Sequence, residues 1–338
     1  MADLASGYNI LQKLGDGARS QVYQVVKPET GEVFALKRVL REGHEDCRFL
    51  DQAIREFEVC SRLQHPYLRK AHELKRVRHL LKLVEVQVVM EYVEGVSLDK
   101  RRPEKLHETV DLFLKVAEAL DAMHQQGLLH TDIKPNNILI TADSKVKIID
   151  FGQSCLVGYR KPRIQGTPDY IAPEQVERRH LGQQTDVFNL GATLYWALTG
   201  EAYPTLITKK GKQVDSVANR RKPVPSPQEL NPEVPSALSK LVMQCCLYEM
   251  GSRPRDMKEV ITQLEMVHHL LTKRQRSESE ATAAAAGQIG AAVAEKQPLP
   301  EVVDFAADSD DSYDFSGFIR EVVDEEAEGR DSGPGGAV

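Results

Sequence analysis

Hydrophobic and polar positions alternate in short runs through the N-terminal part of the chain, and turn residues at Gly15–Gly17 and Lys27–Glu32 separate the runs. Runs of this kind bounded by glycine and proline predict half-buried strands, and successive strands predict an antiparallel meander. Residues 50–63 instead have apolar side chains at helical spacing and end before His65-Pro66. We therefore expect a five-stranded antiparallel sheet with one helix, in which the strands are 8–14, 21–26, 33–39, 71–77 and 82–91.

Helical spacing dominates the middle of the chain. Phe113, Val116, Leu120 and Met123 repeat at intervals of three and four residues, and Gly127 follows where a helix C-cap is expected. A sheet followed by a mainly helical part predicts an α+β fold with two lobes, the first of which ends near residue 92. The further predicted helices are 186–198, 236–247 and 256–272.

The composition changes after residue 273. Residues 281–294 are dominated by alanine and glycine, and residues 301–331 are rich in aspartate and glutamate. A segment with few apolar side chains cannot bury enough surface to offset the entropy of ordering the chain. We expect residues 273–338 to form a low-complexity, acidic and disordered tail, with a short helix near 315–323 as the alternative.

Composition and charge exclude several classes of protein. The 338 residues are 41% hydrophobic and 28% charged, and the formal net charge is −6, so nothing indicates a nucleic-acid partner. No apolar run approaches the ~18–20 residues that a membrane span requires, and the first six residues lack the pattern of a signal peptide. The five cysteines show no metal-ligand spacing, and we interpret them as reduced thiols of a cytoplasmic protein.

One stretch concentrates polar side chains that suit phosphoryl transfer. Asp132, Lys134 and Asn137 lie in one turn, and Asp150 follows the next apolar run. Metal-assisted phosphoryl transfer needs a group that orients the incoming hydroxyl, oxygen ligands for Mg²⁺ and a cation near the phosphoryl oxygens. A single aspartate in a turn is usually a capping residue. It is the spacing of the whole set that favours catalysis.

The segments 130–140 and 146–152 resemble the catalytic loop (residues 130–137 here) and the Asp-Phe-Gly segment of Ser/Thr protein kinases. Residues 166–174, Gly-Thr-Pro-Asp-Tyr-Ile-Ala-Pro-Glu, are similar to the end of a kinase activation segment (residues 153–174 here). The resemblance covers about residues 8–271. It implies transfer of the ATP γ-phosphate, with Mg²⁺, to Ser or Thr hydroxyls of protein substrates, the chain itself included.

The resemblance also implies the two-lobed protein-kinase fold for residues 8–272, with an N-lobe at about 8–92 and a C-lobe at about 93–272. Asp132 would orient the substrate hydroxyl, and Lys134 would meet charge on the transferred group. Asn137 and Asp150 would hold Mg²⁺. The residues assigned to the nucleotide, directly or through a partner, are Leu14, Gly15, Gly17, Val22, Ala35, Lys37, Glu56, Glu91, Val93 and Leu139.

The helix glutamate that pairs with Lys37 has two candidates, Glu56 and Glu58. Two positions along a helix turn a side chain by about 200°, so only one of them can face the sheet. Glu56 shares a face with Cys60 and Leu63, and we prefer it.

Two contacts of the activation segment are implied as well. Thr167 would contact Asp132 and Lys134 in the catalytic loop. Glu174 would pair with Arg253, and loss of either partner of such a buried pair would leave a charge unpaired.

The sequence departs from the kinase pattern at two positions. Ser20 stands where the third glycine of the N-lobe loop is usual, and Thr131 stands where many regulated kinases have an arginine. That arginine is the cation which a phosphate on the activation segment neutralises. Between residues 153 and 165 only Ser154 and Tyr159 could accept a phosphate. We therefore expect activity that does not require phosphorylation of the activation segment.

Two alternatives stay open. The first is a catalytically weak, nucleotide-binding scaffold, whose hallmark would be loss of one of four residues that are all present here: Lys37, Asp132, Asn137 and Asp150. The second concerns the acidic tail, which we expect to be solvated. Its alternative is a weak, salt-sensitive contact with a basic cluster made of Arg160, Lys161 and Arg163.

Overall fold

The computed structural model describes residues 7–294 except 18, 42, 44–46 and 208–222, with side chains described through residue 277. The chain divides into two compact units after Ala281, and the sheet and helices described below belong to the first, apart from the end of the last helix. The predicted acidic segment 301–331 lies outside the described residues.

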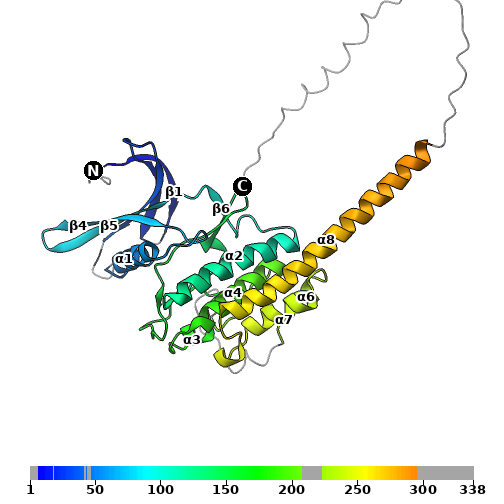
Figure 1. Ribbon diagram of the computed structural model, residues 1–338. Helices are drawn as coiled ribbons and strands as arrows, with labels where there is room; N and C mark the ends of the chain where they lie inside the picture. The colour runs from blue at the N-terminus through cyan, green and yellow to red at the C-terminus, as the bar shows by residue number, and fades with distance from the viewer. Residues whose placement is uncertain (1–6, 18, 42, 44–46, 208–222, 295–338) are drawn as a thin grey trace, which may run out of the picture. The chain divides into compact units, whose positions relative to one another are not determined.

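The N-lobe is a five-stranded antiparallel sheet with one helix, which confirms the prediction (Figure 1). The strand order is β1-β2-β3-β5-β4, so the last strand in sequence lies inside the sheet. Residues 85–90 of this strand are all buried, and they include the polar side chains of Glu85 and Gln87. The strands are β1 (Asn9–Asp16), β2 (Ser20–Val26), β3 (Val33–Leu40), β4 (Ala71–His79) and β5 (Lys82–Glu91).

Helix α1 (Cys47–Arg62) packs one face on this sheet. Leu50 and Ala53 join Val86 and Val88 of β5 in one apolar cluster. Glu56 follows Ala53 on the buried face, because residues three apart on a helix lie on the same side.

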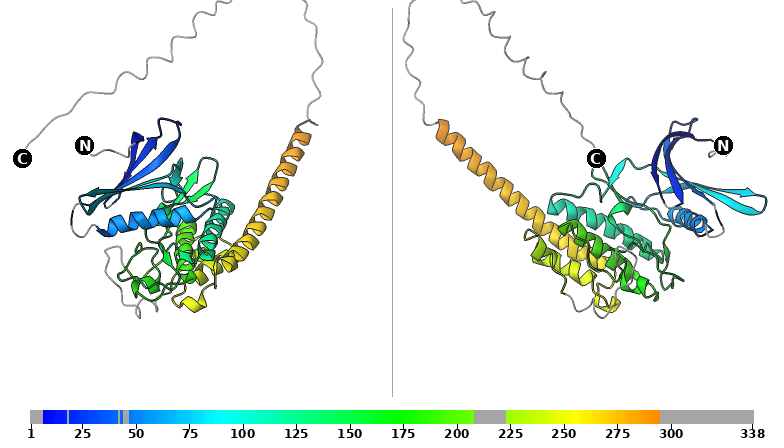
Figure 2. Two further views of the ribbon diagram at one scale, coloured as in Figure 1. Left: turned by 60° about the vertical axis from the view of Figure 1, so that its left-hand side comes forward. Right: turned by 180° about the vertical axis from the view of Figure 1, so that it is seen from behind.

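The C-lobe is built around two long helices, α2 (Leu106–Gln125) and α4 (Gln183–Thr199), which lie side by side (Figures 1 and 2). Helix α7 (Ser236–Cys245) packs on α4 at Gly191. A Cβ at Gly191 would lie 2.5 Å from Cys245 Cβ, so glycine permits the close approach of the two helices.

Short elements connect these helices and carry the polar motifs. The strands form two small sheets, ordered β6-β8-β9 and β10-β7. The remaining elements are β6 (Gly95–Ser97), β7 (Leu128–Leu129), β8 (Ile138–Thr141), β9 (Val146–Ile148), β10 (Cys155–Leu156), α3 (Pro173–Val176), α6 (Pro227–Leu230) and 3₁₀ turns at Pro135–Asn137 and Met250–Ser252.

The last helix, α8 (Met257–Ala294), is longer than predicted. Its first turns pack Met257, Val260 and Leu264 into the C-lobe core. Alanine has the highest helix propensity, and a helix that packing has already nucleated is extended at low cost. This corrects the expectation that residues 273–294 belong to a disordered tail. No helix among the described residues is both long and apolar enough to cross a membrane.

Candidate active site

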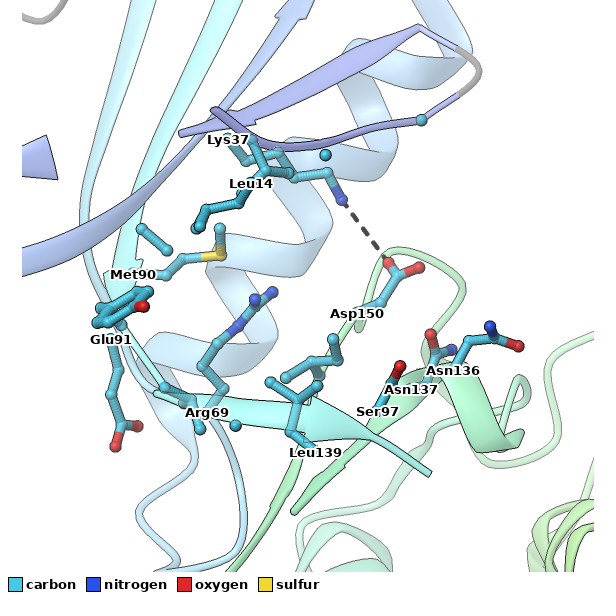
Figure 3. A pocket seen from close by; sticks show the side chains of 18 of the residues that line it. Leu14, Lys37, Arg69, Met90, Glu91, Ser97, Asn136, Asn137, Leu139 and Asp150 are labelled. Carbon is cyan, nitrogen blue, oxygen red and sulfur yellow. Dashed lines mark ion pairs between the residues drawn. The ribbon is translucent and has the colours of Figure 1, made fainter. Parts of the chain in front are cut away.

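A cavity of about 670 Å³ lies between the N-lobe sheet and the strands β6 and β8 (Figure 3). Every residue that the sequence assigned to the nucleotide lines this cavity except Glu56, which reaches it through Lys37. Asn137 and Asp150 line it from the C-lobe side. Sequence reasoning missed several lining residues, among them Arg69, Ser97, Lys100 and Asn136.

The turn between β1 and β2 closes the cavity from above. Gly17 donates its N–H to the Ser20 carbonyl oxygen at 2.7 Å. A Cβ at Gly17 would lie 2.5 Å from Ser20 Oγ, so a larger residue would displace that hydroxyl. Ser20, the departure from the third glycine, therefore packs its hydroxyl closely against Gly17.

The strand β5 and the segment after it form the wall opposite the phosphate motifs. Met90 is fully buried and pairs with Ala35 in the register of β3 and β5. The Glu91 carboxylate is already engaged, because it lies 2.8 Å from Lys147 Nζ and accepts the Lys70 N–H at 3.1 Å. Its side chain points away from the cavity (Figure 3), so a contact from this residue to a nucleotide would come from its main chain.

Lys37 projects from β3 into the cavity and forms an ion pair with Glu56. Lys37 Nζ lies 2.6 Å from Glu56 Oε2. It also lies 3.7 Å from Asp150 Oδ1, a contact that is marked by the dashed line in Figure 3. Glu56 is completely buried, whereas Glu58 is exposed. Glu56 is thus the partner of Lys37, as helix geometry predicted.

A second cation shares the same carboxylate. Arg69 Nη2 donates to Glu56 Oε1 at 2.7 Å, and the Arg69 N–H donates to the Ile148 carbonyl oxygen at 3.1 Å. Arg69 is 9% exposed and its Nε has no hydrogen-bond partner. No sequence pattern pointed to this residue, which lies between α1 and β4 and has the appearance of a surface arginine in the sequence.

The charges in the cavity set the protonation of its carboxylate and its ammonium. Attraction by Lys37, against the opposing effect of burial, lowers the pKa of Asp150 to about 2. Burial by itself would lower the pKa of Lys37, but attraction by Glu56 and Asp150 outweighs it and raises that pKa. Both groups are therefore ionised at neutral pH.

The catalytic loop brings Asp132, Lys134 and Thr167 together. Asp132 Oδ2 lies 2.9 Å from Lys134 Nζ, and Asp132 Oδ1 accepts the Thr167 hydroxyl at 2.9 Å. Lys134 Nζ also donates to Thr167 Oγ1 at 2.8 Å. Asn137 Nδ2 donates to the Asp132 carbonyl oxygen at 2.9 Å, which ties this triad to the cavity wall.

Asp186 at the start of α4 anchors the loop from below. Its carboxylate accepts the N–H groups of His130 at 2.9 Å and Thr131 at 2.7 Å, and it lies 2.8 Å from His124 Nε2. Burial opposes ionisation of Asp186, but these hydrogen bonds and the nearby histidines outweigh it and lower the pKa. The anchor holds Thr131 at φ 64°, a conformation that a β-branched residue rarely adopts.

The residues Asn137 and Asp150 suit a hard divalent cation. Asn137 uses its amide N–H₂ on Asp132, which leaves its amide oxygen available, and Asp150 is an ionised carboxylate on the same cavity. No group of three or more His, Cys, Asp or Glu side chains among the described residues could bind a metal ion alone. Two oxygen ligands completed by phosphate and water fit Mg²⁺ better than a closed transition-metal site.

The activation segment is fixed at its far end by an ion pair. Arg253 donates from Nη1 and Nη2 to the two oxygens of Glu174, at 2.9 Å each, and both side chains are fully buried. A two-point contact of this kind fixes orientation as well as distance. Nearer its start, Lys161 is buried and donates to Thr131 Oγ1. Lys161 is therefore no part of an exposed basic cluster, which corrects that element of the alternative for the tail.

A five-stranded lobe over a helical lobe, with a paired lysine and an aspartate on one cavity and a carboxylate–ammonium pair beside it, defines the protein-kinase class of phosphotransferase folds. The model of the protein kinase domain matches residues 8–271. The chain belongs to the protein kinase family.

The chain is also similar to bacterial proteins of this family. It is 27% identical to a probable serine/threonine-protein kinase of Clostridium acetobutylicum, with 78% of this chain and 40% of that protein covered. It is 30% identical to serine/threonine-protein kinase PknH of Mycobacterium bovis, with 74% and 41% covered, and 27% identical to probable serine/threonine-protein kinase PknB of Lactococcus lactis, with 76% and 41% covered. The chain thus spans about two fifths of the length of these relatives.

Proposed function

We propose that the protein transfers the γ-phosphate of ATP to Ser or Thr hydroxyls of protein substrates. The observation that carries this proposal is the Asp132 carboxylate, which accepts a threonine hydroxyl on one oxygen and lies beside Lys134 on the other. A substrate hydroxyl can donate to the same carboxylate, which orients it toward the nucleotide cavity. The relatives named as Ser/Thr kinases support the choice of acceptor.

The other site residues act on the nucleotide in this proposal. Lys37, held by Glu56, binds phosphate oxygens, and Lys134 meets the charge that develops on the transferred group. Asn137 and Asp150 hold Mg²⁺. The bound ion would supply neutralisation of phosphate charge.

The purine has its place between the lobes. Val22 and Ala35 cover it from the N-lobe, Leu139 supports it from the C-lobe, and the main chain of Glu91 and Val93 meets its edge. The shape of the cavity and the engagement of the Glu91 side chain with Lys147 support this arrangement.

Activity in the unphosphorylated state is part of the proposal. Thr131 replaces the arginine that a phosphate would neutralise. Ser154 is completely buried, which leaves Tyr159 as the accessible acceptor between residues 153 and 165. Location in the cytoplasm stays a prediction, with which the five free cysteines are consistent.

Transfer from labelled ATP with Mg²⁺ to a generic basic protein and to the chain itself tests this function. We expect label on Ser or Thr, and a loss of at least about a hundredfold in Asp132→Asn, because that variant removes the group that orients the hydroxyl. Asp143→Asn is the matched control, since Asp143 is exposed in the β8–β9 turn, and it should keep wild-type activity. No transfer by the wild type, with ATP still bound, would favour the scaffold instead.

A further inference from the structure

Lys161 occupies an unusual place for a lysine of an activation segment. Its side chain is 4% exposed, and its Nζ donates to Thr131 Oγ1 at 2.6 Å and to the Gln153 carbonyl oxygen at 2.8 Å. The Thr131 hydroxyl donates to the same carbonyl oxygen at 2.9 Å. The three groups form a closed triangle between the catalytic loop and the first part of the activation segment.

The cost of burying this ammonium indicates a role other than stability. Burial lowers the pKa of Lys161, since its hydrogen-bond acceptors are neutral oxygens and no described carboxylate forms an ion pair with it. A buried lysine without a carboxylate partner stabilises a fold less than an apolar side chain of the same length would. We therefore look for the role of Lys161 in the positions that these hydrogen bonds fix.

The residue at the apex of the triangle is the one that precedes Asp132. The Thr131 N–H donates to Asp186, and the Thr131 carbonyl oxygen accepts Gln175 Nε2 at 2.8 Å. Gln175 also donates to the Gln165 carbonyl oxygen at 3.1 Å. Gln153 and Lys161 are thus bonded to Thr131 directly, and Gln165 is connected to it through Gln175. The strained φ of Thr131 needs this support.

We propose that Lys161 is a positioning residue that fixes the activation segment on the catalytic loop of the unmodified chain, in the place where an arginine–phosphate contact would otherwise do so. The proposal rests on the kinase activity proposed above. It reverses the usual arrangement, because the cation belongs to the activation segment and the catalytic loop supplies a neutral hydroxyl. The contact that fixes the activation segment is then made by an encoded side chain and needs no phosphate.

The surroundings of two of the segment's hydroxyl groups fit this role, while Tyr159 is 47% exposed. Ser154 is buried with no hydrogen-bond partner for its Oγ, and Thr167 is already bonded to Asp132 and Lys134. A phosphate on either would have to break the arrangement that surrounds the catalytic aspartate.

The first test compares Lys161→Met with the wild type in the full chain, after phosphatase treatment verified by intact mass. We expect kcat to fall about tenfold to a hundredfold, the loss of one charged hydrogen-bond anchor, with the KM for ATP changed less than about twofold. The thermal midpoint should not fall, because the variant removes a buried charge. Lys145→Met, at an exposed turn lysine, is the matched control.

A double-mutant cycle identifies the partner. Thr131→Val removes the hydroxyl that accepts from Lys161 and keeps the shape of the side chain, and the double variant should lose no more activity than Lys161→Met alone. Lys161→Arg should restore part of kcat. The proposal would be overturned if the losses in kcat of the two single variants multiplied in the double variant, or if Lys161→Met kept the wild-type kcat. So would loss of wild-type activity on dephosphorylation of Ser154 or Tyr159.

Amide hydrogen exchange separates this proposal from the proposed function. Residues 153–165 should exchange faster in Lys161→Met than in the wild type, and at the wild-type rate in Lys145→Met. If the wild type transfers no phosphate, the kinase function fails while the exchange result still decides whether Lys161 fixes the segment. Unchanged exchange in an active enzyme contradicts the role of Lys161 alone.

Discussion

Two lysines, the half-buried Lys37 in the N-lobe and the buried Lys161 in the C-lobe, hold the site in opposite ways. Lys37 lies between two carboxylates, at 2.6 Å from Glu56 and 3.7 Å from Asp150, and its pKa is raised. Lys161 bonds to a hydroxyl and a carbonyl oxygen, and its pKa is lowered. The carboxylates around Lys37 stabilise its charge at the place where it would bind a phosphate. The charge of Lys161 is destabilised by burial, and its position allows the hydrogen bonds to Thr131 and Gln153.

The two lobes therefore fix their catalytic side chains through different kinds of contact. In the N-lobe, Glu56 is held by Lys37 and Arg69 together, so helix α1 keeps its place through two independent contacts. In the C-lobe, Thr131 is held by several hydrogen bonds, of which Lys161 contributes one. Removing the shared carboxylate should therefore cost more than removing any single cation.

The largest effect is expected from Glu56→Gln. The change leaves Lys37 and Arg69 without their common charge partner, and loss of one partner of a buried ion pair typically costs about 3–5 kcal/mol. Urea unfolding should show a loss of that size, and phosphate transfer should fall as Lys37 loses its position. Glu58→Gln, two residues further along the same helix and exposed, should change neither. Equal effects of the two variants would mean that Glu56 is not the shared anchor.

A smaller effect is expected from Arg69→Leu. Glu56 keeps Lys37, so the free energy of unfolding should fall by about 1–3 kcal/mol, the value of one hydrogen bond to a charged group with its desolvation. Lys70→Leu at the exposed neighbour is the matched control. Kinetics with ATP should show that the KM rises less than in Glu56→Gln. A loss as large as that of Glu56→Gln would show that Arg69, and not Lys37, is the main holder of α1.

Some of these residues could be predicted from the sequence and others could not. The alternation of apolar and polar runs in the N-terminal part and the spacing of Asp132, Asn137 and Asp150 are local patterns, and they predicted the sheet and the polar residues in and beside the cavity. Arg69 and Lys161 are single basic residues whose partners come from α1 and from the catalytic loop. Only the folded chain brings these partners within reach, so a pattern along the sequence carries no signal for them.

The same limit explains the end of α8. Composition alone predicted disorder from residue 273, because alanine contributes little apolar surface. The buried first turns of the helix supply the nucleus that composition does not reveal, and alanine then continues it to Ala294.

The smallest expected effect is the pH dependence of the Lys161 site. The charged and titratable groups that influence it are Cys155, Asp132, Asp186 and Arg55. Because the pKa of Lys161 is lower in the folded chain than the ~10.4 of an unfolded lysine, the unfolded chain binds more protons in between, and this contribution to the free energy of unfolding rises with pH. The wild type should therefore gain stability relative to Lys161→Met as the pH rises toward ~10.4, by less than about 1.4 kcal/mol per pH unit. Lys145 has a raised pKa through its hydrogen bond to Asp143, so the same comparison with Lys145→Met should show no gain. A difference between wild type and Lys161→Met that stays flat or falls with pH in urea unfolding would mean that the ammonium is solvated, and the contrast between the two lysines would be lost.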